Sequence, residues 1–174
     1  VTHGSIRFGL LAIRNLGRGF IARLLEEREQ GGKYTSFYQF CKRLHGREMN
    51  RRTLESLIKS GALDGLGANR RQMLAVAETV LDNLDAEKKQ NLDGQIGFFE
   101  AMGQAPRDEI AFPDVEEFPA SELLSMEKEI TGMYLSGHPM AAYAQAAARL
   151  NAAKIGEIAE AHGEYDRYHD ATNV

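Results

Sequence analysis

The sequence predicts an all-α fold. Through the first 85 residues, apolar side chains recur three and four positions apart, which is the spacing of one face of a helix. Glycines end each of these stretches, and no alternation of apolar and polar residues is long enough to build a sheet. These observations predict five short helices, followed by a linker and further helices.

The five helices are expected to follow one another with short turns between them. Gly17 and Gly19 mark the first turn, and Ser36 and Asn50 are suited to cap the helices that follow them. The predicted helices cover Ile6–Asn15, Arg18–Gln30, Ser36–Leu44, Arg51–Ser60 and Asn69–Leu84. Because a helix, a glycine turn and a second helix occur twice, residues 1–84 are predicted to form a tandem helix-hairpin-helix domain.

Beyond Leu84 the helical pattern weakens. Residues 85–120 are acidic and hold three of the four prolines, which predicts a linker. Order is expected to return in a helical segment, residues 121–161, that packs on or after the first domain; Ser121 would cap its first helix, over Glu122–Thr131. Residues 162–174 are predicted to be a disordered tail.

Charge is distributed unevenly along the chain. The first 72 residues contain 14 Lys and Arg against 6 Asp and Glu, a net charge of +8, whereas the other 102 residues carry −12. A basic domain of this size is expected to bind a polyanion, with nucleic acid the first candidate and an anionic membrane the second. Apolar runs fall well short of the roughly 20 residues that span a bilayer. The single cysteine, Cys41, excludes disulfide and zinc-thiolate scaffolds and fits a cytoplasmic protein.

The turn between the first two predicted helices is a candidate binding site. Its glycines would let the backbone turn sharply and present the amides of residues 16–19 at the start of the second helix. Unpaired N–H groups and the helix dipole attract an anion, and flanking arginines would add hydrogen bonds to a phosphodiester. The candidate DNA contacts of this first hairpin are Arg14, Leu16, Gly17, Arg18, Gly19 and Arg23. The alternative is a tight helical connection with solvated arginines around it.

A similar arrangement recurs between Leu54 and Leu74. Its candidate DNA contacts are Lys59, Gly61, Gly65, Gly67, Asn69, Arg70 and Arg71. Paired hairpins of this kind would hold phosphates on either side of a minor groove and would contact the backbone rather than the bases. Asp64 is poorly suited to a phosphate site, so a partly structural role for this second hairpin stays open.

Three separated motifs, in this order, resemble the alpha subunit of bacterial DNA polymerase III. They are IRFGLLAIRNLGRG near the start, LESLIKSGALDGLG with NRRQML in the middle, and MEKEITGMYLSGHPM late in the chain. The resemblance covers roughly residues 5–143. It implies that this region binds duplex DNA behind the fingers of a larger enzyme.

The same resemblance implies where the chemistry of that enzyme would lie. The palm carboxylates, the nucleotide-binding fingers and the PHP segment are expected to precede Val1, and an OB-fold to follow the last helices. The parent would be a DNA-directed DNA polymerase, a nucleotidyltransferase that uses Mg. No catalytic residue, metal ligand or cofactor is expected in this chain itself.

The predicted linker contains the segment QIGFF, which resembles the internal clamp-binding motif of this polymerase family. Gln95 would hold the peptide by amide hydrogen bonds, Ile96, Phe98 and Phe99 would enter apolar pockets of the sliding clamp, and Gly97 would permit the bend. The alternative, from the residues alone, is that the two phenylalanines cover the core of the helical domain.

The expected function is non-catalytic. The chain would hold primer-template duplex DNA without sequence specificity and tether the polymerase to its β sliding clamp, which supports processive replication. Other replisome subunits would be partners through the parent chain, and no membrane partner is expected. Two alternatives stay open. A helix-hairpin-helix repair enzyme would need a catalytic constellation beside a pocket, and a protein-interaction module would have lost its DNA affinity.

Overall fold

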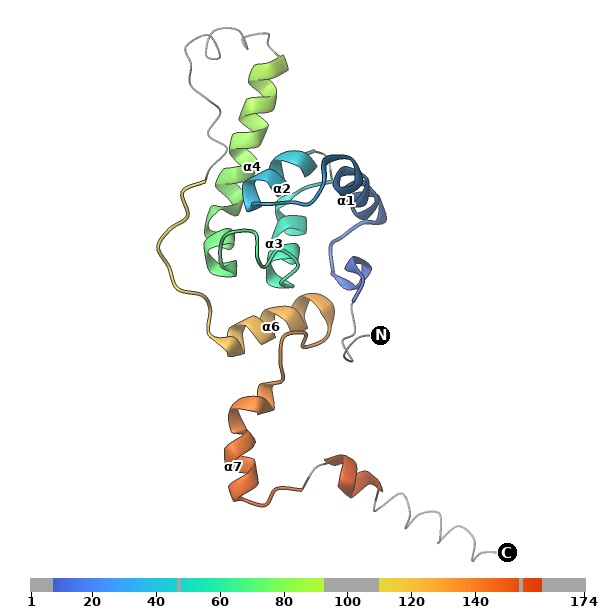
Figure 1. Cartoon of the computed structure of the whole chain (residues 1–174), viewed down its shortest axis with the longest axis vertical. Helices are drawn as coiled ribbons and strands as arrows, with labels where there is room; N and C mark the ends of the chain where they lie inside the picture. The colour runs from blue at the N-terminus through green and yellow to red at the C-terminus, as the bar shows by residue number, and fades with distance from the viewer. Residues whose placement is uncertain (1–7, 47, 93–109, 154, 161–174) are drawn as a thin grey trace, which may run out of the picture. The chain divides into compact units, whose positions relative to one another are not determined.

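The computed structural model describes residues 8–46, 48–92, 110–153 and 155–160, and every regular element in these ranges is helical. The elements are η1 (Leu10–Ala12), α1 (Arg18–Gly31), α2 (Phe37–Leu44), α3 (Arg51–Lys59), α4 (Arg70–Leu92), α6 (Ala120–Thr131), η2 (Pro139–Tyr143) and α7 (Ala144–Arg149), shown in Figure 1. Residues 155–160 are also helical. The all-α prediction is confirmed. The chain divides into two compact units, Val1–Ser136 and Gly137–Val174.

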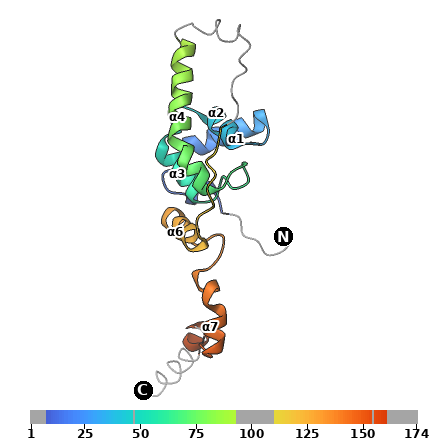
Figure 2. The same ribbon diagram turned by 90° about the vertical axis from the view of Figure 1, so that its left-hand side faces the viewer.

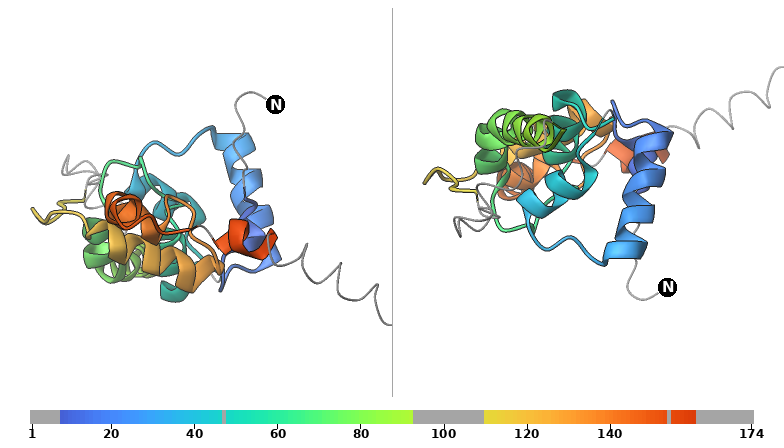
Figure 3. Two further views of the ribbon diagram at one scale, coloured as in Figure 1. Left: turned by 90° about the horizontal axis from the view of Figure 1, so that it is seen from below. Right: turned by 90° about the horizontal axis from the view of Figure 1, so that it is seen from above.

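The core of the first unit is centred on α2 and α3. Their buried residues are spaced three and four apart and pack on the apolar face of α4, and Figure 3 shows both helices between α4 and α1. The core side chains of α2, α3 and α4 include Phe37, Phe40, Cys41, Leu44, Leu54, Leu57, Ile58, Met73, Ala77, Val80 and Leu84. Burial raises the pKa of the Cys41 thiol to about 12, so this cysteine acts as an unreactive core residue.

Helix α1 lies against α2 and is held by two buried side chains and by contacts near its C-terminal end. Phe20 and Leu24 point into the core, and the Tyr34 hydroxyl donates to the carbonyl of Leu24 at 2.9 Å. The Arg43 guanidinium of α2 lies over the Tyr34 ring, 4.4 Å from its centroid, and donates to the carbonyl of Gly32. These contacts leave the first two residues of α1 exposed.

Side-chain caps begin two of the helices as the sequence predicts. The Ser36 hydroxyl accepts from the amide of Gln39 at 3.2 Å, and the Asn50 side chain accepts from the amide of Thr53 at 3.0 Å. The predicted cap at Ser121 is wrong. Helix α6 begins two residues earlier, at Ala120 after Pro119, whose ring presets a compatible backbone angle but supplies no side-chain acceptor.

The predicted helix over Ile6–Asn15 is also wrong in the described residues, where only the three-residue helix η1 forms. The backbone is extended at Ile13, and Asn15 has a φ of 64°, which no right-handed helix accommodates. The Arg14 amide donates instead to the carbonyl of Ile130 in α6, at 3.0 Å. A tertiary hydrogen bond therefore replaces the helical one.

The described residues of the segment expected as a linker, 85–92 and 110–120, belong to the first unit. Helix α4 continues eight residues past its predicted end at Leu84, and Figure 2 shows it extending beyond α1, α2 and α3. Residues 110–119 then pack against the helices, with the Phe112 ring 6.2 Å from that of Phe37. The sequence did not predict this packing, because the segment is acidic and its apolar residues do not have the spacing of a helix.

Helix α6 packs on α3 and completes the first unit, with Ile130 and Glu127 buried. The second unit contains η2 and α7. His138 caps η2 by accepting from the amide of Met140 at 3.1 Å, and neither of these helices has a buried residue. None of the described helices is long and apolar enough to cross a membrane.

Candidate nucleic-acid interface

The first hairpin is a tight turn held by α3. Asn15, at its apex, is in the left-handed region and donates through its side chain to the hydroxyl of Ser56 at 3.0 Å. The Thr53 hydroxyl lies 3.3 Å from the carbonyl of Asn15. Both partners belong to α3, so the helix that enters the second hairpin also sets the shape of the first.

The turn leads into an open helix N-terminus. Gly17 caps α1 without a side-chain acceptor, and the first bond back to the turn runs from the Ile21 amide to the carbonyl of Gly17 at 3.2 Å. The amides of Arg18, Gly19 and Phe20 therefore have no acceptor within the helix. No acidic residue lies in this first turn. Aligned N–H groups and the positive end of the helix dipole favour an anion here.

Two of the predicted arginines flank this open end. Arg14 and Arg18 are exposed, and no described carboxylate lies within ion-pairing distance of either. Arg23 differs from the prediction. It is half-buried and donates to the carbonyl of His45 at 3.0 Å, so it joins α1 to the end of α2. Leu16 packs partly against the core.

The second hairpin is built from glycines in the left-handed region. Gly61, Gly65 and Gly67 have φ values of 77°, 91° and 93°, which side chains other than glycine rarely adopt. They turn the chain from α3 into α4. Their conformational role is clear from these angles, and no separate contact with a phosphate is needed to account for them.

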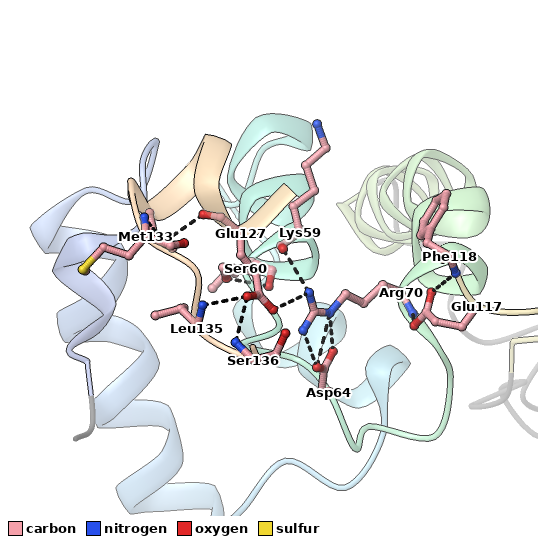
Figure 4. Close-up of polar contacts among 12 residues, drawn as sticks. Lys59, Ser60, Asp64, Arg70, Glu117, Phe118, Glu127, Met133, Leu135 and Ser136 are labelled. Atoms are coloured by element: carbon pink, nitrogen blue, oxygen red, sulfur yellow. Dashed lines mark hydrogen bonds and ion pairs between the residues drawn. The ribbon is translucent and has the colours of Figure 1, made fainter. Parts of the chain in front are cut away.

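Arg70 is directed into the protein rather than outward, which contradicts its predicted role as a DNA contact. Its side chain donates to Asp64 at 2.7 and 2.9 Å, to Glu127 at 3.1 Å and to the carbonyl of Lys59 at 3.3 Å (Figure 4). The residue is 5% exposed. Hydrogen bonds that Arg70 donates to Asp64, together with the two negative charges, raise the pKa of Arg70 despite its burial.

The N-terminus of α4 is closed by the protein's own acidic segment. The Glu117 carboxylate accepts from the amides of Arg70 at 2.8 Å and Arg71 at 3.1 Å. Asn69 and Gln72 satisfy each other in a capping box, with side-chain-to-amide distances of 2.8 and 3.0 Å. A phosphate would have to displace Glu117, so the two hairpins are not equivalent.

The remaining predicted residues of the second hairpin are also engaged within the protein. Asn69 donates to the carbonyl of Val115 at 3.0 Å, and Lys59 lies 3.7 Å from Glu129. Arg71 is exposed, with its guanidinium 5.4 Å from the centre of the Phe118 ring. Of this hairpin's predicted contacts, Arg71 is the side chain that keeps its charge at the surface.

The sequence offered little to reveal Glu117 and Glu127. Glu127 lies in a helix rich in charge, where a solvated face is the ordinary interpretation, yet it is fully buried. Burial would raise the pKa of Glu127, but the amides of Ser136 and Leu135 and the Arg70 side chain outweigh it and lower that pKa. Among the described residues, no three His, Cys, Asp or Glu side chains are grouped to hold a metal ion. Residues 95–99, the predicted clamp-binding peptide, lie outside the described residues.

Comparison with known proteins also identifies a helix-hairpin-helix motif in this chain. Residues 1–73 match the helix-hairpin-helix motif family. The chain is similar to DNA polymerase III subunit alpha of Neisseria meningitidis serogroup B (37% identical over 88% of this chain), Borreliella burgdorferi (36% over 84%) and Vibrio cholerae (32% over 90%). It spans 13–14% of the length of these relatives. The resemblance to the alpha subunit of bacterial DNA polymerase III is confirmed.

Proposed function

From this similarity to the polymerase III alpha subunit, we propose that the chain is a non-catalytic segment that binds duplex DNA through the first hairpin. The observation that carries the proposal is the open N-terminus of α1 beside two exposed arginines, Arg14 and Arg18, neither of which is paired with a carboxylate in the described part of the chain. Amides and guanidinium groups together suit one or two neighbouring phosphates of a DNA strand.

The contrast between the hairpins supports this assignment. At the second hairpin, Glu117 already accepts from the first amides of α4, and the Arg70 guanidinium is buried against two carboxylates. Its role in the proposal is to support the first hairpin, because Ser56 and Thr53 of α3 hold Asn15. Arg70 and Arg23 are left out of the DNA contacts, and Arg71 is kept as a peripheral one.

A protein that binds in this way contacts the phosphates of DNA and does not recognise its bases. Affinity should therefore be independent of sequence and should fall with salt, with the logarithm of the association constant changing by a slope of about −0.9 against log salt for each phosphate neutralised. One or two phosphates give a slope of about −1 to −2. A weak site of this size is useful to a polymerase that is also attached elsewhere, since two linked attachments slow dissociation.

The second attachment in the proposal is the peptide Gln95–Phe99, which would bind the β sliding clamp. Its support is its sequence, QIGFF, and its position in a polymerase-like chain. The larger protein would be a cytoplasmic, Mg-dependent DNA polymerase, with other replisome subunits as partners. In this arrangement the described domain contributes DNA contact and the peptide contributes clamp contact, and together they support processivity.

The test is fluorescence anisotropy of a labelled random-sequence duplex titrated with the protein at several salt concentrations. Arg18→Gln should weaken binding about fivefold or more and lower the salt slope by about one. Arg28→Gln is the matched control, because it removes an exposed arginine from the other end of α1.

Equal losses in the two variants would mean that only net charge matters and would contradict a site at the first hairpin. Absence of binding by the wild-type protein would contradict the DNA-binding proposal and favour the protein-interaction alternative. Binding of a fluorescent QIGFFE peptide to purified sliding clamp, with a Phe98→Ala peptide as control, tests the clamp contact separately.

A further inference from the structure

A carboxylate lies beside Gly19, in the first turn of α1. A Cβ atom placed on Gly19 would be 2.6 Å from Oε1 and 3.2 Å from Oε2 of Glu48, whereas one placed on Gly17 would meet nothing within 4 Å. Gly19 is not in the left-handed region, so its backbone does not require a glycine. The space that glycine leaves at this position is filled by an anion belonging to the protein.

The backbone of Glu48 is attached to the same structure that shapes the first hairpin. Its carbonyl accepts from the Thr53 hydroxyl at 3.3 Å, and that hydroxyl also contacts the carbonyl of Asn15 at 3.3 Å. One side chain of α3 thus places Glu48 beside the turn.

The Glu48 carboxylate has no basic partner among the residues that the structure describes. The residue is exposed, and no Lys or Arg side chain of the described residues lies within ion-pairing distance of it. Within the described residues, the positive charge beside it is that of the N-terminal end of α1, where the amides of Arg18, Gly19 and Phe20 lack helical acceptors.

We propose that Glu48 competes with a phosphate for the first hairpin: its carboxylate lies beside the first turn of α1, where it repels a phosphate, and it must move aside when DNA binds. This inference rests on the proposed function. The displacement is physically easy, because Glu48 is a flexible surface side chain rather than backbone. Its effect is to set the DNA affinity of the hairpin below the value that the open amides and arginines would otherwise give.

The test compares Glu48→Gln with Glu29→Gln in the same duplex titration. Glu29 is an exposed residue near the other end of α1 with the same charge, so the control corrects for the change in net charge. Removing an anion from a helix N-terminus should tighten DNA binding by about three- to tenfold beyond the control. Without DNA, the ¹H–¹⁵N resonances of Arg18, Gly19 and Phe20 should shift in Glu48→Gln and stay in place in Glu29→Gln.

Each outcome bears on one proposal. Equal gains in the two variants, or unmoved amide resonances, would overturn the role of Glu48 while leaving DNA binding by the hairpin intact. If neither the wild-type protein nor folded Glu48→Gln binds duplex DNA, the proposed function fails and the competitor role fails with it.

Discussion

Arg70 and Glu127, 57 positions apart in the sequence, form an ion pair in the interior of the first unit, with Nη1 and Oε1 3.1 Å apart. They are 5% and 0% exposed. The other oxygen of Glu127 accepts from the amides of Leu135 and Ser136 at 2.8 and 2.9 Å (Figure 4). This pair joins the second hairpin to α6 and to the chain that leaves it, and it commits an arginine suited to phosphate binding to a structural role.

Replacing Glu127 by alanine should destabilise the protein by about 3–5 kcal/mol, because it leaves the Arg70 charge buried with only Asp64 to balance it. The measurement is urea unfolding followed by circular dichroism. Glu129→Ala on the same helix is the control, since Glu129 is 61% exposed and lies 3.7 Å from Lys59. Its removal should cost less than about 1 kcal/mol. Similar losses in the two variants would contradict the importance of the buried pair.

Stability should fall in acid partly through Glu127. Its pKa is lowered in the folded protein, so the unfolded chain binds the proton more tightly and the native state gains stability at pH values above the ordinary pKa of 4.5. This contribution is lost as pH falls through the folded-state pKa. The unfolding free energies of wild-type protein and Glu127→Gln should therefore converge as pH is lowered from neutral to about 3. A difference that is independent of pH would argue against an ionised Glu127.

Glu117→Ala should cost about 1–2 kcal/mol, because it removes the acceptor for the first two amides of α4. Glu116→Ala, at an exposed neighbouring position, should change the unfolding free energy by less than about 0.5 kcal/mol. Duplex affinity should rise equally in both variants, since Arg70 stays buried when Glu117 is removed. A selectively large gain in Glu117→Ala would mean that the second hairpin can also bind phosphate.

Asn15→Ala should destabilise the first hairpin by about 1–2 kcal/mol. The change removes the hydrogen bond to Ser56 and places a residue less tolerant of positive φ at 64°. Asn15→Gly loses the same hydrogen bond but accepts the backbone angle, so it should be the less destabilised variant and keep more of the DNA affinity. Thermal unfolding and the duplex titration together check this order. If backbone strain were unimportant, Asn15→Gly would be the more destabilised of the two variants.

The sequence alone was enough to predict the features that depend on near neighbours. Ser36 and Asn50 were identified as caps because a cap bonds an amide only three residues away. The face of α2 that carries Phe37, Phe40 and Cys41 follows from a spacing of three and four residues. The glycine turns and the family resemblance likewise depend on residues read in order along the chain.

Tertiary structure decided which of two similar hairpins is open. Arg18 and Arg70 both lie at the start of a helix that follows a glycine turn, and Asp64 is the one nearby residue that sets the second hairpin apart in the sequence. The difference comes from Glu117 and Glu127, which lie 47 and 57 positions from Arg70 and reach it only after the chain has folded back past α4. Local patterns predict helices because helical contacts span three or four residues, whereas the charge that meets a given side chain is set by whichever distant segment packs against it.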